Sequence, residues 1–355
     1  AWIGVLTALV AAIAAVGQTD IKRILAYSTI SQVGFMVAAV GAGAYWAGIF
    51  HVLTHAFFKA LLFLGAGSVI HALGGEQDIR KMGGLGKRMK VTGTTALIAT
   101  LAIAGVPFLS GFFSKDAIVV ATFTSGVLAD VGGGVLFWLL MITAGITAFY
   151  MFRWYYLIFG GEERLDRGVA ERVHESPTVM TAPLVVLAIG SVLIGYVGLP
   201  AFLTDNRVQA WLARATAAGE FSHPSVATEW LLVLGSAAVA LVGLGLGYWV
   251  YVTSKGALAK RAGDTVLAGA SRGAFGFDPL YKALFTDTGS GAAEAVSLLD
   301  KEVVDRGLVS LAGLVPLLGG VVRRWQSGHI RAYAFAMFVG AAGLALVAAL
   351  LGVLK

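Results

Sequence analysis

Apolar segments about as long as a lipid bilayer is thick recur along this chain of 355 residues, and they constrain its fold more than any other feature. Each runs for roughly 17 to 28 residues, and a helix needs about 20 apolar residues to cross the hydrocarbon core of a membrane. The composition agrees, since 58% of the residues are hydrophobic and only 13% are charged. A transmembrane barrel would instead show short strands of alternating polarity. The sequence therefore predicts an all-α polytopic membrane protein.

One apolar segment, Trp46 to Leu73, carries three ionisable side chains at equal spacing. His51, His55 and Lys59 follow one another at intervals of four residues, which places them on one stripe of a helix. A lysine at mid-bilayer costs about 3 kcal/mol and is a functional-site hypothesis by default, and imidazoles change charge near neutral pH. The row predicts a path for protons. The alternatives are packing histidines with an interfacial lysine, or a zinc site, which lacks a third ligand nearby; no metal site is predicted.

A second polar motif interrupts the segment that follows. GVPFLSGFFSKD, Gly105 to Asp116, places Pro107 between two glycines, which predicts a membrane helix broken at 105–112. Such backbone is tolerated at membrane depth only against protein or water. Lys115 is expected near the positive end of the second half-helix, which disfavours its charged form, while Asp116 would favour it. The alternative is an ordinary loop with an interfacial Lys and Asp.

Hydroxyl and amide groups also cluster at the start of an earlier span. The stretch YSTISQ, Tyr27 to Gln32, lies within a predicted membrane helix. Such groups bond neighbouring helices or hold water.

The sequence divides into four parts. Residues 277–327 open with FDPLY and carry acidic and apolar residues at helical spacing, which predicts a lateral amphipathic helix on the membrane surface. Breaks or kinks are expected in it at Gly289, Gly291, Gly307 and Pro316. The other predicted parts are a five-helix bundle at 1–159, additional transmembrane helices at 160–276, and a C-terminal transmembrane anchor at 328–355.

Charge and cysteine content narrow the possible functions. The net charge is +6, but the basic residues lie in loops between spans, which indicates topology rather than nucleic-acid binding. Their side is predicted to be cytoplasmic, and the lateral helix would lie on that face. The absence of cysteine excludes disulfides and cysteine-held iron–sulfur clusters from this chain.

Three motifs resemble one family in order and spacing. They are TDIKRILAYSTISQVGFM (Thr19 to Met36), HVLTHAFFKALLFLGAGSVIH (His51 to His71) and GVPFLSGFFSKD. Together they resemble the antiporter-like membrane subunits of respiratory complex I, NADH:quinone oxidoreductase. The C-terminal segment with FDPLY and one more span resembles the distal L-type branch of that family (chain 5).

The resemblance implies a role for each matched position. Lys59 would relay protons at mid-membrane, with His51 and His55 beside it, and Lys115 with Asp116 would pass them outward. Candidate coupling residues of the lateral helix are Asp300 and Asp305, which are otherwise its solvated face.

The resemblance also implies a cellular location, partner subunits and cofactors for the complex. The chain would be a proton-translocating subunit in a bacterial inner membrane, with sister antiporter-like subunits and lipids as partners. No redox site is expected here, and NADH, FMN, iron–sulfur clusters and quinone would belong to other subunits. The alternatives are a subunit of a multisubunit Na⁺(K⁺)/H⁺ antiporter, or a structural brace that holds sister subunits through the lateral helix.

One departure from the family concerns its repeats. Members are built from two inverted repeats, whereas only one HxxxHxxxK helix and one SGFFSKD break occur here. Residues 1–159 therefore look like the second repeat alone, and the chain is expected to be a piece of a longer protein that does not pump protons by itself.

Overall fold

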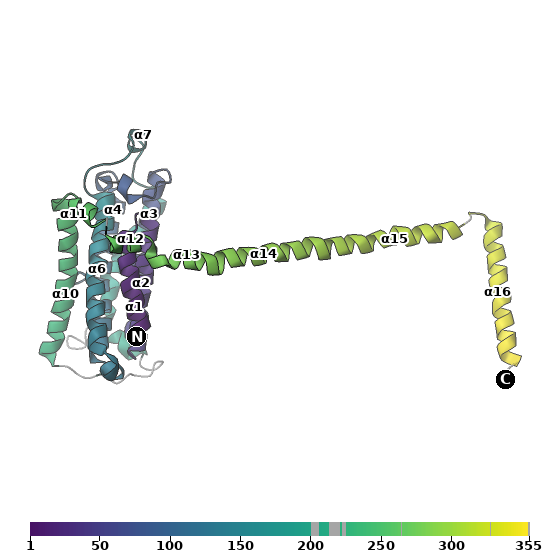
Figure 1. Cartoon of the computed structure of the whole chain (residues 1–355), viewed down its shortest axis with the longest axis horizontal. Coiled ribbons are helices and arrows are strands. Elements are labelled where there is room, and N and C mark those ends of the chain that lie inside the picture. Colours follow the sequence, from purple (N-terminus) through teal and green to yellow (C-terminus); the bar gives the residue numbers. More distant parts are fainter. Residues whose placement is uncertain (200–205, 213–220, 222–224, 264, 327, 354–355) are drawn as a thin grey trace. The chain divides into compact units, whose positions relative to one another are not determined.

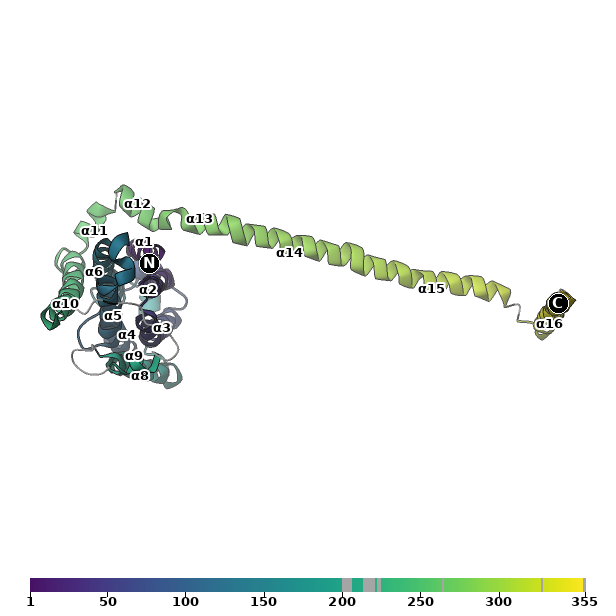
Figure 2. The same cartoon turned by 90° about the horizontal axis from the view of Figure 1, so that it is seen from below.

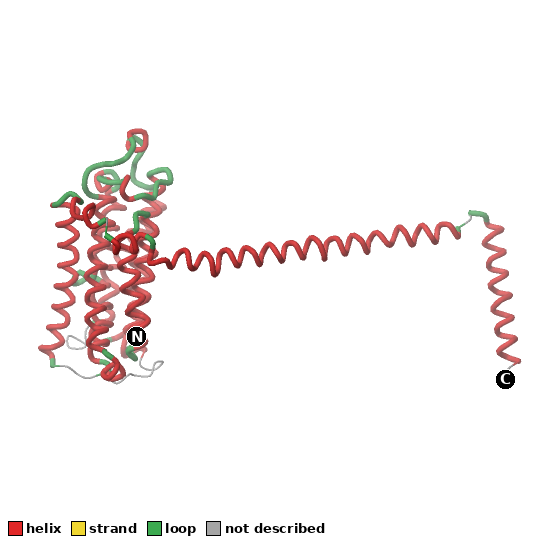
Figure 3. Tube along the Cα trace, in the orientation of Figure 1, coloured by secondary structure: helices red, strands yellow, loops and turns green. Residues whose placement is uncertain are grey.

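The computed structural model describes residues 1–199, 206–212, 221, 225–263, 265–326 and 328–353. It divides into two units, a helix bundle at Ala1–Asp278 and a C-terminal unit at Pro279–Lys355. The described residues form helices joined by loops, with only two isolated β-bridges (Figure 3). The predicted all-α fold is thereby confirmed.

The bundle is built from upright helices that lie side by side (Figure 1). Its first six long helices are α1 (Trp2–Gly17), α2 (Ile21–Gly41), α3 (Tyr45–Ala72), α4 (Lys90–Ala104), α5 (Ser110–Thr124) and α6 (Gly133–Phe159). Two further long helices flank them: α8 (Thr178–Leu193) packs on α3 and α4, and α10 (Val226–Tyr248) packs on α6 and α5 (Figure 2). Short helices complete the unit, α7 (Arg167–Ala170), α9 (Arg207–Leu212), α11 (Ala257–Ala262) and α12 (Val266–Arg272).

Helix lengths agree with a multi-pass membrane protein. In the described part of the chain, 7 helices are long and apolar enough to cross a membrane, and α1 and α4 are shorter apolar helices. The longest of the 7, Ala274–Arg324, has 51 residues. At ~1.5 Å per residue it is roughly 75 Å long, more than twice the hydrocarbon thickness of a bilayer. It is therefore too long for a simple crossing.

The interior of the bundle consists of two apolar clusters. One gathers around Trp154 and Phe58, and the other around Phe35 and Leu136. Along α2, α3 and α6 the members of the two clusters occupy opposite ends of each helix, with buried polar residues between them. These polar residues are Ser28, Ser31, Gln32, His51, Thr54 and Thr147. A polar layer therefore separates two apolar layers.

The first two helices touch backbone to backbone. A Cβ at Gly4 would meet the Ala38 nitrogen at 2.4 Å, and one at Gly34 would meet the Ala8 nitrogen at 2.6 Å. Small residues let membrane helices approach this closely. Ser31 joins the contact, because its hydroxyl donates to the Ala8 carbonyl at 2.9 Å.

The loop between α3 and α4 is fastened to the start of α2. The Ile21 N–H donates to the Gln77 carbonyl at 2.9 Å, and the Ile79 N–H donates to the Thr19 carbonyl at 2.9 Å. Hydrogen bonds from the Arg80 side chain hold the pKa of the Asp78 carboxyl below its ordinary value. The loop therefore has a defined position over the end of the bundle.

The C-terminal unit is helical through the residues where breaks were predicted. Helices α13 (Phe277–Tyr281), α14 (Thr288–Leu299) and α15 (Arg306–Trp325) are joined by π-helical turns at Lys282–Asp287 and Asp300–Asp305. The expected breaks at Gly289, Gly291, Gly307 and Pro316 are wrong. A glycine weakens a helix by only about 1 kcal/mol, and Pro316 removes one hydrogen bond from a helix of 20 residues. A further helix, α16 (Ile330–Val353), follows; the predicted ends of the last two parts, residues 327 and 355, lie outside the described residues.

The close contact of α1 and α2 gives a stability prediction. Gly34→Ala should lower the unfolding free energy by about 1 to 3 kcal/mol, because the new methyl group collides with backbone. Gly67→Ala is the matched control, since a Cβ there meets no atom within 4 Å. Thermal unfolding of the detergent-solubilised protein would measure both. Equal melting temperatures for the two variants would contradict the packing described.

Candidate functional site

Lys59 lies near the middle of α3 with its amine inside the bundle. The side chain is buried, and Nζ donates to the Ser28 hydroxyl at 2.9 Å and to the Leu25 carbonyl at 3.3 Å. The Tyr150 hydroxyl donates to the same Ser28 oxygen at 2.8 Å. Lys59 is therefore hydrogen-bonded to α2, and Tyr150 of α6 is hydrogen-bonded in turn to its partner Ser28. It cannot reach a membrane surface from this position.

His51 lies about two helical turns before Lys59 in α3 and contacts a different set of groups. Its Nε2 lies 3.2 Å from Gln32 Oε1, and its Nδ1 lies 2.9 Å from Ser114 Oγ. A neutral imidazole donates from one nitrogen and accepts at the other. If Nε2 donates to Gln32, Nδ1 accepts from Ser114, whose oxygen is also 2.7 Å from the Thr54 hydroxyl. The ring thus joins α2 to α5.

His55 stands between these two residues without a hydrogen bond at one nitrogen. Its ring centroid lies 6.1 Å from that of His51 and 5.5 Å from that of Phe58. Within the described residues, its buried Nε2 has no hydrogen-bond partner. The same holds for Gln32 Nε2, Thr100 Oγ1 and Ser110 Oγ. Buried polar atoms of this kind are positions where ordered water binds in proteins.

The broken helix forms within the predicted stretch 105–112, but the break is shorter than predicted, because residues 110–112 already belong to the next helix. Helix α4 ends at Ala104, Gly105 adopts the left-handed conformation with φ of +83°, and α5 begins at Ser110. A Cβ at Gly111 would lie 2.0 Å from the Ala102 carbonyl oxygen. Glycine is thus required where the start of α5 crosses the end of α4.

Lys115 reaches back across this break to the end of α4. Its Nζ donates to the Ile103 carbonyl at 2.6 Å and lies 5.4 Å from the centroid of the Phe35 ring. The last carbonyls of a helix carry the negative end of its dipole, which attracts cations. Lys115 itself belongs to the first turns of α5, as predicted, but its flexible side chain carries the amine back across the break to the negative end of α4.

Asp116 points to another helix. Its carboxylate accepts a hydrogen bond of 2.8 Å from Ser236 of α10, and the side chain is buried. Consecutive residues on a helix are ~100° apart, which separates Asp116 from its neighbour. Among the described residues no Lys115–Asp116 ion pair occurs, so Asp116 does not neutralise that amine directly.

Several of these partners were not singled out from the sequence. The stretch Tyr27 to Gln32 was expected to bond neighbouring helices or hold water, and two of its members, Ser28 and Gln32, contact Lys59 and His51. Tyr150 and Ser236 lie in apolar runs more than 90 residues away from Ser28 and Asp116. No spacing rule connects residues so distant in sequence.

The end of the bundle unit is hydrogen-bonded to residues at the end of α1 and the start of α2, and we call this set of contacts the clasp. Asp278 pairs with Arg23, and the Tyr27 hydroxyl donates to the same carboxylate. The Gln18 amide donates to the carbonyls of Ser271 and Arg272, at 3.2 Å each. Tyr27, which bonds Asp278, and Ser28, which bonds Lys59, are consecutive residues of α2.

Asp300 and Asp305 are not part of these contacts. Both belong to the C-terminal unit, where their side chains are exposed. Across the described ranges, no three His, Asp or Glu side chains gather where they could hold a metal ion.

Comparison with known proteins identifies similar chains. Residues 1–147 match a family model described as "NADH:quinone oxidoreductase/Mrp antiporter, TM". NAD(P)H-quinone oxidoreductase chain 5 of Picosynechococcus sp. is 40% identical over 368 residues, which cover 95% of this chain and 54% of that protein. NADH-quinone oxidoreductase subunit L of Mycobacterium tuberculosis is 40% identical, with coverage of 96% and 52%.

A solved structure agrees with the fold. A chain of the Mrp complex from Dietzia sp. superposes with a TM-score of 0.53 at 23% identity, covering 98% of this chain and 33% of that one. At this identity the likeness concerns the fold alone. The present chain spans about half the length of the curated relatives it matches.

The clasp gives a prediction about local stability. Asp278→Asn removes the ion pair with Arg23 and weakens the bond from Tyr27, and both groups of the ion pair are about half exposed. Exposed ion pairs contribute about 0.2 to 1 kcal/mol, so amides of residues 271–278 should exchange with solvent up to about fivefold faster. Hydrogen–deuterium exchange measures this directly.

A matched control uses a second exposed carboxylate. Asp287 pairs with Lys282 at 2.8 Å on the C-terminal unit, so Asp287→Asn should leave exchange at 271–278 unchanged. Equal protection of 271–278 in both variants would show that Asp278 does not hold this segment.

Proposed function

Because the chain belongs to the antiporter-like family of NADH:quinone oxidoreductase and Mrp membrane subunits, we propose that it is part of a proton-translocating L-type subunit of respiratory NADH:quinone oxidoreductase. The single observation that carries the proposal is the buried row of ionisable groups in a membrane-spanning bundle. Lys59, His51 and Lys115 are all buried. Lys59 donates to Ser28 of α2, His51 is hydrogen-bonded to α5 and α2, and Lys115 donates to the end of α4. Intramembrane ionisable groups of this kind mark ion pathways.

The proposed relay runs through the polar layer of the bundle. A proton on the Lys59 amine can pass to the water that we infer beside His55 Nε2, and from there along the layer toward Lys115. Gln32 Oε1 is an amide oxygen that accepts a hydrogen bond but does not carry a proton, so it would orient the His51 ring, and His51 would exchange protons on the side of Ser114. Each step moves one proton along a hydrogen bond and forms no covalent intermediate.

Electron transfer from NADH to quinone elsewhere in the complex would supply the energy, and coupled charges would direct the movement of protons. Two interacting ionisable groups bind protons as a pair, so that a change of charge at one alters the proton affinity of the other. Lys59 and Lys115 lie in one bundle without a neutralising carboxylate on either amine in the described residues. Protonation of one therefore disfavours protonation of the other, and this repulsion would move protons outward past Lys115 and Asp116.

The remaining parts of the proposed complex would lie outside this chain. We place NADH, FMN, the iron–sulfur clusters and quinone in other subunits, and the first antiporter-like repeat in the part of the relatives that this chain does not span. We further propose a bacterial inner membrane, the lateral helix on its cytoplasmic face, and sister antiporter-like subunits and lipids as partners. A Na⁺(K⁺)/H⁺ antiporter subunit uses the same fold with another driving force, and an NADH-oxidising partner would distinguish the two.

One observation favours a second role, that of a structural brace. The clasp of Asp278 on Arg23 and Tyr27 fixes the chain immediately before the C-terminal unit. A long helix can link subunits more effectively when the residues at its beginning are held in place. The two roles are compatible, and they predict different effects of substitutions in the relay.

The relay is tested by Lys59→Ala and Lys59→Arg in the complete complex. Arginine keeps the positive charge but does not release its proton at physiological pH. Both variants should therefore lower NADH-driven proton uptake into vesicles by about tenfold or more, the usual scale for loss of a proton-transfer group. Lys22→Ala, at an exposed lysine, should leave uptake unchanged.

Assembly of each variant has to be measured in the same preparation. Assembled Lys59 variants that pump the wild-type number of protons per electron would exclude the relay and leave the brace as the function of this chain.

The lateral-helix carboxylates are tested separately. We keep Asp300 and Asp305 as coupling candidates, so Asp300→Asn with Asp305→Asn should lower the number of protons moved per electron while the complex still assembles. An unchanged ratio would assign both to the solvated face of the helix.

A further inference from the structure

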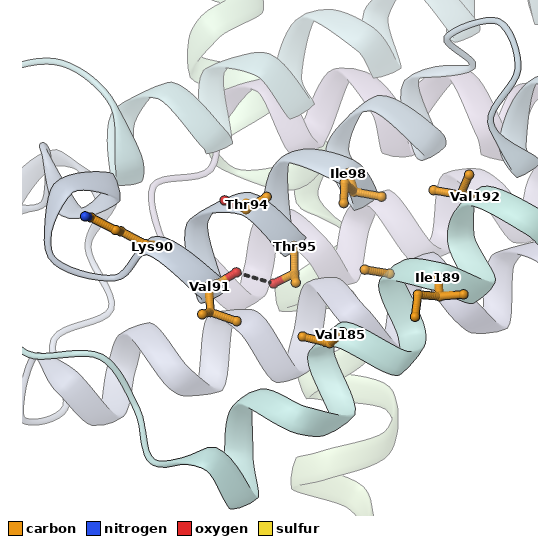
Figure 4. Close-up of a pocket in the computed structure, with 9 residues that line it drawn as sticks. Lys90, Val91, Thr94, Thr95, Ile98, Val185, Ile189 and Val192 are labelled. Atoms are coloured by element: carbon orange, nitrogen blue, oxygen red, sulfur yellow. Dashed lines mark hydrogen bonds between the residues drawn. The ribbon is translucent and has the colours of Figure 1, made fainter.

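A groove lies between α4 and α8, away from the relay residues. Its volume is about 440 Å³, within the range of small-ligand sites. Thr95 and Ala188 form a buried floor, and Val185 and Ile189, which are 42% and 55% exposed, line one wall (Figure 4). The groove is therefore open to whatever surrounds the bundle at membrane depth.

The floor of the groove offers an occupant no free polar group. The Thr95 hydroxyl donates to the Val91 carbonyl at 2.9 Å and to the Thr92 carbonyl at 3.1 Å. The other residues that line the groove are aliphatic, apart from the exposed Thr94, which lies beside Thr95, and Lys90 at one end (Figure 4). Such a surface excludes sugars and nucleotides, which need polar partners, and it favours a hydrocarbon.

A cation stands at one end of this apolar row. Lys90 begins α4, and its nitrogen points away from the aliphatic side chains (Figure 4). Lys90 forms no ion pair in the described part of the chain. The carboxylate that reaches this helix turn, Glu175, is committed to the N–H groups of Val91 and Thr92 and to the Thr92 hydroxyl. Lys90 is therefore available to an external anion.

The length and the lining of the groove fit a lipid chain. From Lys90 to Ile98 the rise along α4 is ~12 Å, close to the thickness of one leaflet of hydrocarbon. An acyl chain lying along these aliphatic side chains would therefore reach from Lys90 toward the middle of the membrane.

We propose that the α4–α8 groove binds an acyl chain of an anionic phospholipid, with Lys90 holding its headgroup. The apolar walls supply the affinity for the chain, and the lysine supplies the preference for negative charge. The lipid site does not depend on proton transfer through Lys59, so its test is independent of the test of the proposed function.

The test uses the complete complex in vesicles with a photoactivatable group on the lipid acyl chain. Phosphatidylglycerol should label peptides that contain residues 91–98 and 185–192, and phosphatidylcholine should label them about fivefold less, the effect of one lysine near a membrane surface. Lys90→Ala should remove that preference, whereas Lys87→Ala, at an exposed lysine that does not line the groove, should preserve it.

A second pair of variants tests the groove itself. Ile189→Trp fills it and should abolish the labelling, while Val186→Trp, at a 65% exposed position outside the groove, should not. Equal labelling by both lipids that also survives Ile189→Trp would overturn the proposal, because that result is expected of bulk lipid that is not bound in the groove. Cross-links from these peptides to a sister subunit in place of lipid would overturn it as well, since protein would then cover the groove.

Discussion

The structure depends on the burial of amines and imidazoles inside an apolar bundle. A buried charge or polar group without partners is costly, and in a membrane water does not reach every such group. The bundle therefore brings hydrogen-bond partners from several helices to α3: Ser28 for Lys59, and Gln32 with Ser114 for His51. These bonds fix which faces of α2, α3 and α5 meet. Apolar clusters on both sides then close the polar layer off from the ends of the bundle.

The broken helix extends this layer sideways. By ending at Ala104, helix α4 leaves the Ile103 carbonyl free to accept from Lys115. The adjacent Asp116 turns instead to α10 and Ser236. Neighbouring residues of one half-helix thus connect to two different helices, and α10 takes part in the candidate site although it lies outside the family-model match at residues 1–147. An unbroken helix would have no carbonyl to offer at this depth.

Helix α2 links the relay to the C-terminal end of the bundle unit. Arg23 and Tyr27 hold Asp278, and the next residue, Ser28, holds Lys59. Close packing of α1 on α2 through Gly4 and Gly34 keeps this helix in place. A displacement of α2 would therefore change both the clasp and the hydrogen bonds of the Lys59 amine, so the proposed brace and the proposed relay share this helix.

The sequence by itself determined the helices of this protein and which of their buried residues are ionisable. Apolar length specified the membrane helices, the spacing of His51, His55 and Lys59 marked the polar helix, and Pro107 between two glycines marked the break, because these signals are local in the chain. The predicted breaks of the long C-terminal helix failed, since single residues such as Pro316 do not outweigh the hydrogen bonds of the surrounding turns. Only the tertiary structure decided where each ionisable side chain points: Lys59 toward Ser28, and Lys115 toward α4 instead of Asp116. Those directions are set by contacts between residues more than 30 positions apart, or by the reach of a flexible side chain across a break, and neither leaves a periodic trace in the sequence.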